Sequence, residues 1–402
     1  MNLLVLNSGS SSIKCSVFAA DQDSPRSLFE GEVSRIGSEH AAFSFHRSGE
    51  KQPSSPVQAR NPTDAIDEVL NAVTRPQVPH IDAVGYRVVH PGPSIHNHVR
   101  IDDGILDELD RAATFAPLHD PPSTAIIRET RTRFPDVPHF ACFDTIFHQT
   151  MPEVASVYAI PSVYREQGVH RYGAHGLSCE SIVEQLRRTH RPIPQRMAIA
   201  HLGSGCSVTA LVNGISIDTT MGLTPTGGVV MGTRPGDLDP GVILYLLRQM
   251  AGERDRATNS LEQLLNHSSG IASLSGLPND MRDIRKAAAD GNHDARLAID
   301  VFTRSIRKTL GSFSWVMGGL DAIIFTGGIG EHDSQTRAEI LDQLQPLGIH
   351  MDATLNVAAK PSSEEPVQRL STSDSKTDIL LVPAKEDWMI AIHLERMLKE
   401  TH

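Results

Sequence analysis

The chain has few cysteines, and their spacing excludes the commonest cysteine-based frameworks. Four cysteines are scattered along 402 residues without a CxxC pair, namely Cys15, Cys142, Cys179 and Cys206. Disulfide-stapled secreted folds and cysteine-rich zinc sites both need closely spaced cysteines. The cysteines are therefore expected to be reduced thiols, as in a cytoplasmic protein.

Long apolar runs and excess positive charge are also missing. The chain opens with the short apolar stretch MNLLVL, without a basic run, and no apolar segment reaches the length that spans a bilayer. The net charge is −11, so general electrostatics do not favour nucleic acid or an anionic membrane. We expect no signal peptide, no membrane span and neither of these partners.

Two common nucleotide-binding motifs are not found where they would be needed. The P-loop pattern GxxxxGK[ST] is absent. A dinucleotide-binding fold uses GxGxxG after its first strand, whereas here the densest glycine run, Gly327–Gly330, comes late and with different spacing. The sequence therefore disfavours a P-loop enzyme and a dehydrogenase.

What is present is an alternation of strands and helices, and the length predicts two or three domains. One helix has a clear N-terminal signal, because Asn61 can cap it and Pro62 suits its first position. Strands are predicted at 2–7, 13–19, 27–34, 42–46, 81–89, 138–143, 197–202, 206–212 and 378–383. Helices are predicted from 62, at 103–115, 122–134 and 293–317, and at the end of the chain.

Two sequence echoes point to an internal duplication. VLNSGSSSIKCSVF (5–18) resembles AHLGSGCSVTALVN (200–213), and IDAVGYRVVHPG (81–92) resembles LDAIIFTGGIG (320–330). The echoes occur in the same order, which favours two copies of one domain, although chance similarity between apolar strands is the alternative. The final helix could pack back onto the first copy.

Glycine-serine turns follow the first strand of each copy. Glycine lets backbone N–H groups approach a phosphate closely, and hydroxyl groups add donors. An ordinary hairpin turn is the alternative for either turn alone, but two matched turns favour phosphate binding. The candidates are Asn7, Ser8, Gly9, Ser10, Ser11, Ser12 and Lys14, then Gly203, Ser204, Gly205 and Ser207.

Two arginines are candidates for binding anions. Arg87 lies inside an apolar strand, where a guanidinium needs an anionic partner; a structural carboxylate competes with a substrate for that role. Arg234 lies on a glycine-rich loop, and a solvated surface charge is its alternative interpretation. Gly327, Gly328, Ile329 and Gly330 would let a flat nucleotide lie against the backbone.

Two acidic residues stand where strands end or helices begin. Asp144 follows a strand, and Glu386 lies between the last strand and the last helix. Each can be a Mg²⁺ or water ligand, or simply a helix cap. His119 and His175 occupy tight turns and could donate to a phosphoryl group or be structural. For His96 and His98 we expect a polar surface rather than a metal site.

At these residues the chain resembles the acetate kinase family, the acetate and propionate kinases of the sugar-kinase/Hsp70/actin fold. The match runs nearly end to end and in order, which makes it highly specific. The matching stretches are LNSGSSSIK (6–14), RVVH (87–90), APLH (116–119), FDTIFHQTMP (143–152), RYGAHG (171–176), HLGSGCS (201–207), DTTMGLTPTGG (218–228), MGTRPGDLDP (231–240) and FTGGIGE (325–331).

The resemblance implies an α/β fold of two duplicated actin-like (ribonuclease H-like) domains around a nucleotide-binding cleft. Residues 1–148 with 387–402 would form the first domain and 149–386 the second. The family reaction is phosphorylation of a short-chain carboxylate by ATP, giving an acyl phosphate and ADP, with Mg²⁺ as cofactor. A small carboxylate and ATP are the implied partners, and the implied assembly is a homodimer.

The family's functional positions can be transferred residue by residue. The implied catalytic residues are Arg87, His119, Asp144, His175 and Arg234. Asn7 and Glu386 would serve Mg²⁺. The implied acyl pocket consists of Val89, Leu118 and Pro225, with Ala174 at its end. The nucleotide would contact Asn7, Ser10, Ser12, Lys14, His201, Gly203, Ser204, Gly205 and Gly327 to Gly330.

The chain departs from the family pattern at several of these positions. The family usually has Phe where Ala174 stands, so the pocket is expected to accept propionate or a larger acid as well as acetate. Ser204 and Asp120 each replace an Asn, and Tyr86 replaces a His. A propionate or butyrate kinase, a regulatory nucleotide-binding homologue and a sugar kinase are therefore the alternatives. A hydroxyl acceptor normally needs a general base, whereas a carboxylate is already ionised at pH 7.

Overall fold

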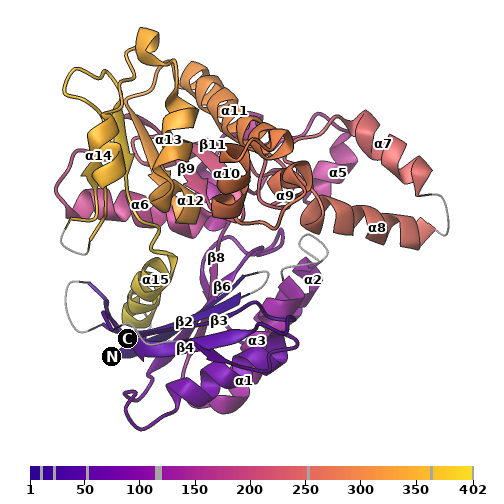
Figure 1. Ribbon diagram of the computed structural model, residues 1–402. Coiled ribbons are helices and arrows are strands. Elements are labelled where there is room, and N and C mark those ends of the chain that lie inside the picture. Colours follow the sequence, from indigo (N-terminus) through magenta and orange to yellow (C-terminus); the bar gives the residue numbers. More distant parts are fainter. Residues whose placement is uncertain are drawn as a thin grey trace. The chain divides into compact units, whose positions relative to one another are not determined.

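The computed structural model describes residues 1–9, 12–20, 24–50, 54–113, 120–250, 254–362 and 365–400. The chain forms two compact units. Unit 1 comprises Met1–Ile146, Gly176–Ser181 and Lys385–His402, and unit 2 comprises Phe147–His175 and Ile182–Ala384. Figure 1 shows each unit as an α/β body with its own sheet. The division into two actin-like domains at 148/149 and 386/387 stays a prediction.

The sheet of unit 1 has the strand order β5-β4-β3-β2-β1-β6-β8-β7. The β1–β2 and β2–β3 pairs are antiparallel, whereas β6 lies parallel to both β1 and β8. Three parallel strands therefore end at the same edge of this sheet. The strands are β1 (Asn2–Ser8), β2 (Ser12–Ala19), β3 (Arg26–Ser34), β4 (Ala42–Arg47), β5 (Ser55–Pro56), β6 (Ala83–Val88), β7 (Val99–Arg100) and β8 (His139–Phe143).

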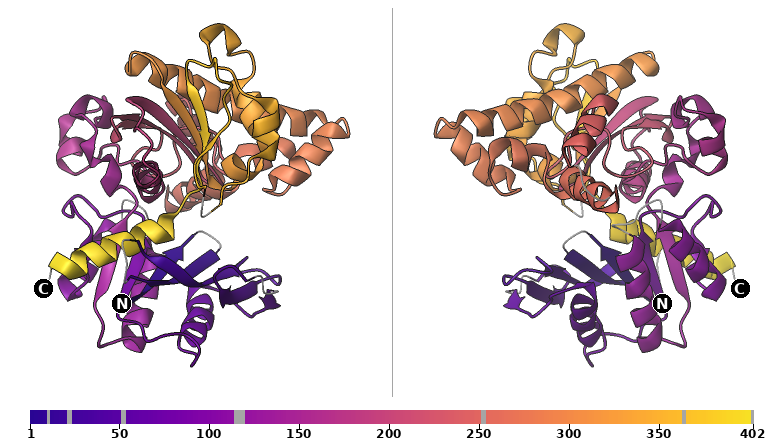
Figure 2. Two further views of the ribbon diagram at one scale, coloured as in Figure 1. Left: turned by 90° about the vertical axis from the view of Figure 1, so that its left-hand side faces the viewer. Right: turned by 90° about the vertical axis from the view of Figure 1, so that its right-hand side faces the viewer.

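Helices cover both faces of this sheet. Alternate residues of β1 enter different cores: Leu4 and Leu6 pack with α1 (Pro62–Val73), α2 (Asp103–Ala112) and α3 (Asp120–Arg133). Leu3 and Val5 pack with α15 (Glu386–Glu400), which Figure 2 shows in yellow beside the sheet. The alternation follows from the two-residue period of a strand. The last helix thus packs on the first half of the chain, as predicted.

The sheet of unit 2 has the order β11-β10-β9-β12-β14-β13. Again the first three strands pair antiparallel, while β12 lies parallel to β9 and to β14. The strands are β9 (Arg196–Leu202), β10 (Cys206–Val212), β11 (Ile215–Thr219), β12 (Ala322–Thr326), β13 (Gln368–Arg369) and β14 (Asp378–Leu381).

The longest helix of unit 2, α11 (His293–Val316), supplies Phe302, Ile306 and Leu310 to the core beneath β9 and β12. The other helices of unit 2 are α4 (Glu153–Ser156), α5 (Ser162–Glu166), α7 (Pro240–Gln249), α8 (Arg254–His267), α9 (Gly270–Ser275), α10 (Met281–Ala289), α12 (Gly327–His332), α13 (Ser334–Leu341) and α14 (Ala353–Ala358). Helix α6 (Gly176–Arg188) and the 3₁₀ turn Ile146–Thr150 run across the boundaries between the units, and a second 3₁₀ turn is Gln345–Leu347.

The two sheets repeat one topology. The order β3-β2-β1-β6-β8-β7 matches β11-β10-β9-β12-β14-β13, with the same pairs parallel and antiparallel. The two sequence echoes fall on equivalent elements, because β1 and β2 correspond to β9 and β10, and β6 corresponds to β12. The α/β class and the duplication predicted from the sequence are confirmed.

Local predictions mostly hold to within a few residues. Asn61 caps α1, accepting the N–H of Asp64, and Pro62 begins the helix as predicted. The helix predicted at 103–115 is observed as α2, which ends at Ala112; residues 114–115 lie outside the described residues. None of the described helices is long and apolar enough to cross a membrane.

Candidate functional site

In unit 1, predicted site residues lie where the parallel strands end. Asn7 on β1 pairs in register with Arg87 on β6, and Arg87 pairs with Cys142 on β8. Asp144 directly follows β8, and its N–H donates to the carbonyl of Val88. Register therefore brings the three strand ends together, at the edge where α/β sheets usually bind ligands.

Arg87 is the central cation of this cluster. Its Nη2 donates to Asp144 Oδ2 at 2.7 Å, and its Nη1 donates to the carbonyl of Ser8 at 3.3 Å. Its Nε lies 3.8 Å from Glu386 Oε2 and is a buried donor without a hydrogen bond among the described residues. Burial disfavours the charged guanidinium, but Asp144 and Glu386 raise the pKa of Arg87 above its ordinary value. The side chain therefore stays cationic, and its buried Nε–H can donate to a further acceptor.

Asp144 is fully buried and anchored on both sides. Besides the Arg87 ion pair, its Oδ1 accepts the N–H of Leu177 at 3.3 Å, and its carbonyl accepts the N–H of Gly176. Both donors belong to the first turn of α6. The helix-cap interpretation and the functional interpretation of Asp144 are thus compatible.

A second acidic residue, Asp387, was missed by the sequence reasoning. Asn7 Nδ2 donates to Glu386 Oε2 at 3.1 Å and to Asp387 Oδ1 at 2.9 Å, and Ser16 Oγ donates to Asp387 Oδ2 at 2.7 Å. Burial raises the pKa of Asp387, against the hydrogen bonds from Asn7 and Ser16. Two adjacent acids at the start of the last helix were the available signal.

The composition of this cluster fits a magnesium ion. Asp144, Glu386 and Asp387 outnumber Arg87, so the group has a surplus of hard oxygen donors. Mg²⁺ usually takes one or two carboxylates and completes its shell with water and phosphate oxygens. Because the Asn7 amide donates both of these hydrogen bonds through Nδ2, its carbonyl oxygen is the atom that could serve a metal.

The first phosphate turn is described only in part. Ser12 begins β2, and its carbonyl accepts the N–H of Gly9. Lys14, opposite Asn7 in the hairpin, is exposed. Ser10 and Ser11 lie outside the described residues, as do His119 and Leu118.

Asp120, at a position where the family resemblance implies an Asn, is buried at the start of α3. Its Oδ1 accepts the N–H of His90 at 3.3 Å, and burial raises its pKa to about 8. At pH 7 the carboxyl is therefore largely protonated. In shape and charge it then resembles the asparagine that it replaces.

In unit 2, the second glycine-serine turn lies beside two histidines. His175 has a left-handed backbone (φ 64°) and precedes α6, and its Nδ1 lies 2.9 Å from Ser207 Oγ. Its ring stacks on His201, with centroids 4.1 Å apart and planes 15° from parallel. The structure thus brings His175, predicted to be catalytic, and His201, predicted to contact the nucleotide, to the turn Gly203–Gly205.

Arg234 reaches the same turn from its loop. A Cβ placed on Gly205 would stand 3.4 Å from both Arg234 Nη1 and His175 Nε2. Arg234 Nη1 also donates to the carbonyl of Pro225 at 3.0 Å. Arg234 is therefore not a simple solvated charge: it links the predicted pocket residue Pro225 to the phosphate turn.

The glycine run 327–330 forms the start of α12 rather than an extended turn. Gly327 has φ 76°, and a Cβ there would collide with the backbone of Leu202 at the end of β9. Gly328 is exposed, and a Cβ there would meet nothing within 4 Å. Glu331 Oε1 accepts the N–H of Gly327 at 3.0 Å and fixes this segment. Backbone at Gly328 is open to a ligand.

Two of the predicted pocket residues, Val89 and Ala174, are buried, each within its own unit. Val89 is 7% exposed in unit 1. Ala174 is 3% exposed and belongs to the core of unit 2, and its carbonyl lies 3.2 Å from His148 Nε2. Pro225 is partly exposed.

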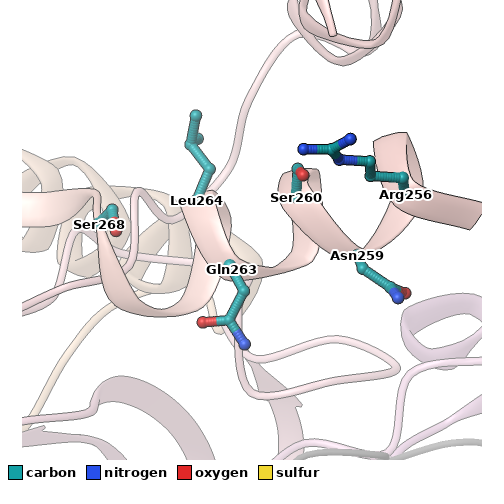
Figure 3. Close-up of a pocket in the computed structure, with 6 residues that line it drawn as sticks. All are labelled: Arg256, Asn259, Ser260, Gln263, Leu264 and Ser268. Carbon is teal, nitrogen blue, oxygen red and sulfur yellow. The ribbon is translucent and has the colours of Figure 1, made fainter. Parts of the chain in front are cut away.

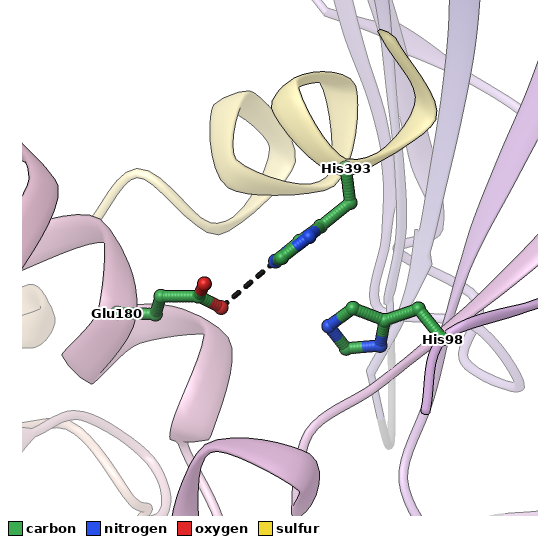
Figure 4. A group of neighbouring side chains, drawn as sticks. All are labelled: His98, Glu180 and His393. Atoms are coloured by element: carbon green, nitrogen blue, oxygen red, sulfur yellow. Dashed lines mark hydrogen bonds and ion pairs between the residues drawn. The ribbon is translucent and has the colours of Figure 1, made fainter. Parts of the chain in front are cut away.

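One expectation is wrong: His98 does not lie on a polar surface. Figure 4 shows it beside Glu180 of α6 and His393 of α15, and their ligand atoms lie within 4.8 Å of one another. His393 Nε2 lies 2.8 Å from Glu180 Oε2. Sequence spacing could not reveal this, because the three residues come from distant segments.

The tautomer of His98 argues against metal binding there. The N–H of Phe143 donates to His98 Nδ1 at 3.0 Å, so the ring proton of neutral His98 is on Nε2. Burial, together with the neighbouring His393, lowers the pKa of His98 to about 3, so the ring is neutral at pH 7. A protonated Nε2 cannot ligate a cation, and the cluster is better described as a hydrogen-bonded Glu180–His393 pair beside a neutral ring.

A groove of about 670 Å³ runs along α8, lined by Arg256, Asn259, Ser260, Gln263, Leu264 and Ser268. Figure 3 shows these side chains arrayed along the helix. None of the predicted site residues lines this groove. It is therefore separate from the clusters described above.

Comparisons with known proteins agree with this geometry. The model of the acetokinase family matches residues 2–392. The chain belongs to the acetokinase family. Acetate kinase of Shewanella sp. (strain ANA-3) is 38% identical over 395 residues, covering 97% of this chain and 96% of that protein. Acetate kinase of Thermoanaerobacter pseudethanolicus is 37% identical, covering 99% of both.

Solved structures of this family share the fold. Acetate kinase of Porphyromonas gingivalis aligns with a TM-score of 0.85 at 30% identity, covering 99% of each chain. A propionate kinase of Francisella tularensis aligns with a TM-score of 0.86 at 33% identity, covering 97% of this chain and 98% of that one. The family predicted from the motifs is confirmed.

The pair Glu180–His393 yields a prediction on acid stability. Burial tends to raise the pKa of Glu180, but the hydrogen bond and charge of His393 lower it overall. A lowered folded-state pKa stabilises the protein above the unfolded pKa of about 4.3, and this contribution is lost as the pH falls through the folded pKa. Glu180→Gln should therefore unfold at lower urea concentration than wild type at pH 7, and the gap should shrink towards pH 4.

Glu39→Gln is the matched control, because Glu39 is exposed in unit 1. It should change the urea midpoint by little at either pH. An equal gap between Glu180→Gln and wild type at pH 7 and pH 4 would contradict the assigned charge of Glu180.

Proposed function

We propose that this acetokinase transfers the γ-phosphoryl group of ATP to acetate, reversibly, giving acetyl phosphate and ADP. The observation that carries the proposal is the family match over residues 2–392. The arrangement of Arg87, Asp144, His175 and Arg234 is consistent with it, because each lies beside a strand end or a phosphate turn.

The chemistry follows from charge. A carboxylate oxygen of acetate attacks the γ-phosphorus, the bond from that phosphorus to the β,γ-bridging oxygen breaks, and ADP leaves with the electron pair. Acetate is ionised at pH 7, so no general base is needed. Both reactants are anions, and catalysis then consists mainly of positioning and neutralisation. Arg87, Arg234 and His175 provide the donors for this task.

We assign the magnesium ion to the carboxylates of unit 1. Glu386 and Asp387, with the carbonyl oxygen of Asn7, would hold it directly or through water. When bound, Mg²⁺ neutralises phosphate charge and orients the phosphates. Ser16 and the Nδ2 of Asn7 keep the two carboxylates in place.

Propionate is the second candidate acceptor. Ala174 stands where the family usually has Phe, and a structural relative is named a propionate kinase. An alanine methyl in place of a phenyl ring is expected to give the acyl chain more room. A hydrophobic pocket discriminates by about 1–3 kcal/mol per methylene, so the preference is expected to be modest.

The first test measures ADP release from MgATP with acetate, propionate, butyrate and glycerol, and traps acyl phosphate as hydroxamate. We expect turnover with acids only, and propionate used at least as well as acetate. Ala174→Phe should lower the propionate/acetate ratio of kcat/KM about tenfold. ATP binding without turnover of any acid would instead identify a regulatory homologue, and an unchanged ratio would reject the pocket assignment.

Replacing the histidine at the phosphate turn tests the transition-state role. His175→Asn should lower kcat about 10²–10³-fold with a smaller change in KM, because a donor to the transferring group is lost. Asn tolerates the left-handed backbone of this position. His190→Asn is the matched control: His190 also has positive φ (53°) and is exposed. Equal kcat values for the two variants would rule out the proposed role.

The homodimer is proposed to form through helix α7 of unit 2. This helix, PGVILYLLRQ, contains no buried residue, and Val242, Leu244 and Tyr245 are 42%, 52% and 59% exposed. An apolar helix with large side chains exposed in this way indicates an interface. A two-fold dimer would let the same face of a second copy cover it. We place the enzyme in the cytoplasm, which suits its four buried free thiols.

Sedimentation velocity tests this interface. Leu244→Glu should shift the enzyme from dimer to monomer at micromolar concentration, because a charge would be buried in an apolar contact. Val357→Glu is the control, since Val357 is 71% exposed on α14. A Leu244→Glu protein that sediments as wild type would place the interface elsewhere.

A further inference from the structure

The second phosphate turn is held by a residue outside the sequence motifs. Asn279 lies just before α10, and its Nδ2 donates to Ser204 Oγ at 3.3 Å. Ser204 is the position where the family usually carries an asparagine. An amide is thus present at this turn, but it comes from a segment 75 residues further along the chain.

Asn279 also packs against the loop that carries Arg234. A Cβ on Gly232 would overlap the Asn279 amide, so the side chain lies directly on the Gly232 backbone. The N–H of Gly232 donates to the carbonyl of Ser204 at 3.2 Å. Asn279 therefore touches both the phosphate turn and the arginine loop, although its side chain is exposed.

Because Asn279 donates to Ser204, two hydrogen-bond donors at this turn can bind a further acceptor. Ser204 Oγ accepts the amide, so its own hydroxyl proton is available to another acceptor. The second N–H of the Asn279 amide has no hydrogen bond among the described residues. Two donors at an exposed glycine-serine turn suit phosphate oxygens.

We propose that Asn279 is a positioning residue for the nucleotide phosphates. From the segment just before α10, it supplies the amide group that residue 204 lacks. The proposal rests on the proposed ATP-dependent function. It explains how the chain can keep a working phosphate turn with serine at 204. In the complex, the Asn279 amide orients the Ser204 hydroxyl and holds the Gly232 loop close to the turn.

Nucleotide affinity and kinetics of the full-length enzyme test this proposal. Asn279→Ala should weaken MgATP binding, measured by calorimetry, and raise KM for ATP, each about tenfold, the loss expected for one hydrogen-bonding group. KM for acetate should stay within about twofold. Asn259→Ala, an exposed change on α8, should leave all three values unchanged.

Rescue separates positioning from simple damage. Ser204→Asn in the Asn279→Ala background should restore most of the lost ATP affinity, because it returns an amide to the turn. A double variant as weak as Asn279→Ala, or an Asn279→Ala enzyme with wild-type affinity, would overturn the proposal. The thermal midpoint of Asn279→Ala should stay within about 2 °C of wild type, as for an exposed substitution.

Combining Gly232→Ala with Asn279→Ala gives an independent check of the contact between Gly232 and Asn279. Gly232→Ala alone should reduce ATP affinity, because its Cβ displaces the Asn279 amide, whereas adding Gly232→Ala to Asn279→Ala should cost nothing further. Additive losses would reject the contact. Wild-type enzyme that binds MgATP but phosphorylates no acid would refute the proposed function alone, and failure to bind MgATP would refute both proposals.

Discussion

The strand-end cluster of unit 1 depends on the ion pairs that the buried Arg87 guanidinium makes. A cation inside a sheet is tolerated only when anions surround it, and the chain supplies these from two other segments: Asp144 after β8 and Glu386 at the start of α15. The Arg87–Glu386 ion pair therefore ties the last helix to β6. Because carboxylates outnumber the arginine, the charge that stabilises Arg87 also creates the surplus that a magnesium ion requires.

Unit 2 has the same sheet topology as unit 1 but carries different residues where its strands end. At the positions that Asn7 and Arg87 take on β1 and β6, the two sequence echoes place Leu202 of β9 and Thr326 of β12, neither of them charged, and Gly203 and Gly327 follow directly. Gly327 allows its backbone to contact Leu202, and Gly328 stays open. Duplication thus gave two equivalent edges, of which one is specialised for charge and the other for close approach to the backbone.

The sequence was informative where chemistry is local. Strand periodicity, the Asn61 cap and the glycine turns predicted elements correctly, and a run of motifs identified the family. Contacts between distant segments were beyond its reach. His98 looked like a surface residue because its partners, Glu180 and His393, lie about 80 and 300 residues away. Two adjacent acids at the start of the last helix were a local signal for Asp387, but its hydrogen bonds come from Asn7 and Ser16, at the other end of the chain.

The departures from the family pattern become intelligible when each is treated as a change of chemical group rather than of residue name. Asp120 replaces an asparagine, yet burial keeps its carboxyl largely protonated at pH 7, so the site gains no charge beside Arg87. Ser204 also replaces an asparagine, and the nearby amide of Asn279 contacts it. Ala174 differs from both, because nothing among the described residues returns a phenyl ring to its place. The changes at Asp120 and Ser204 are compensated and should conserve the reaction. The change at Ala174 is not compensated, so a change of acid substrate should arise there.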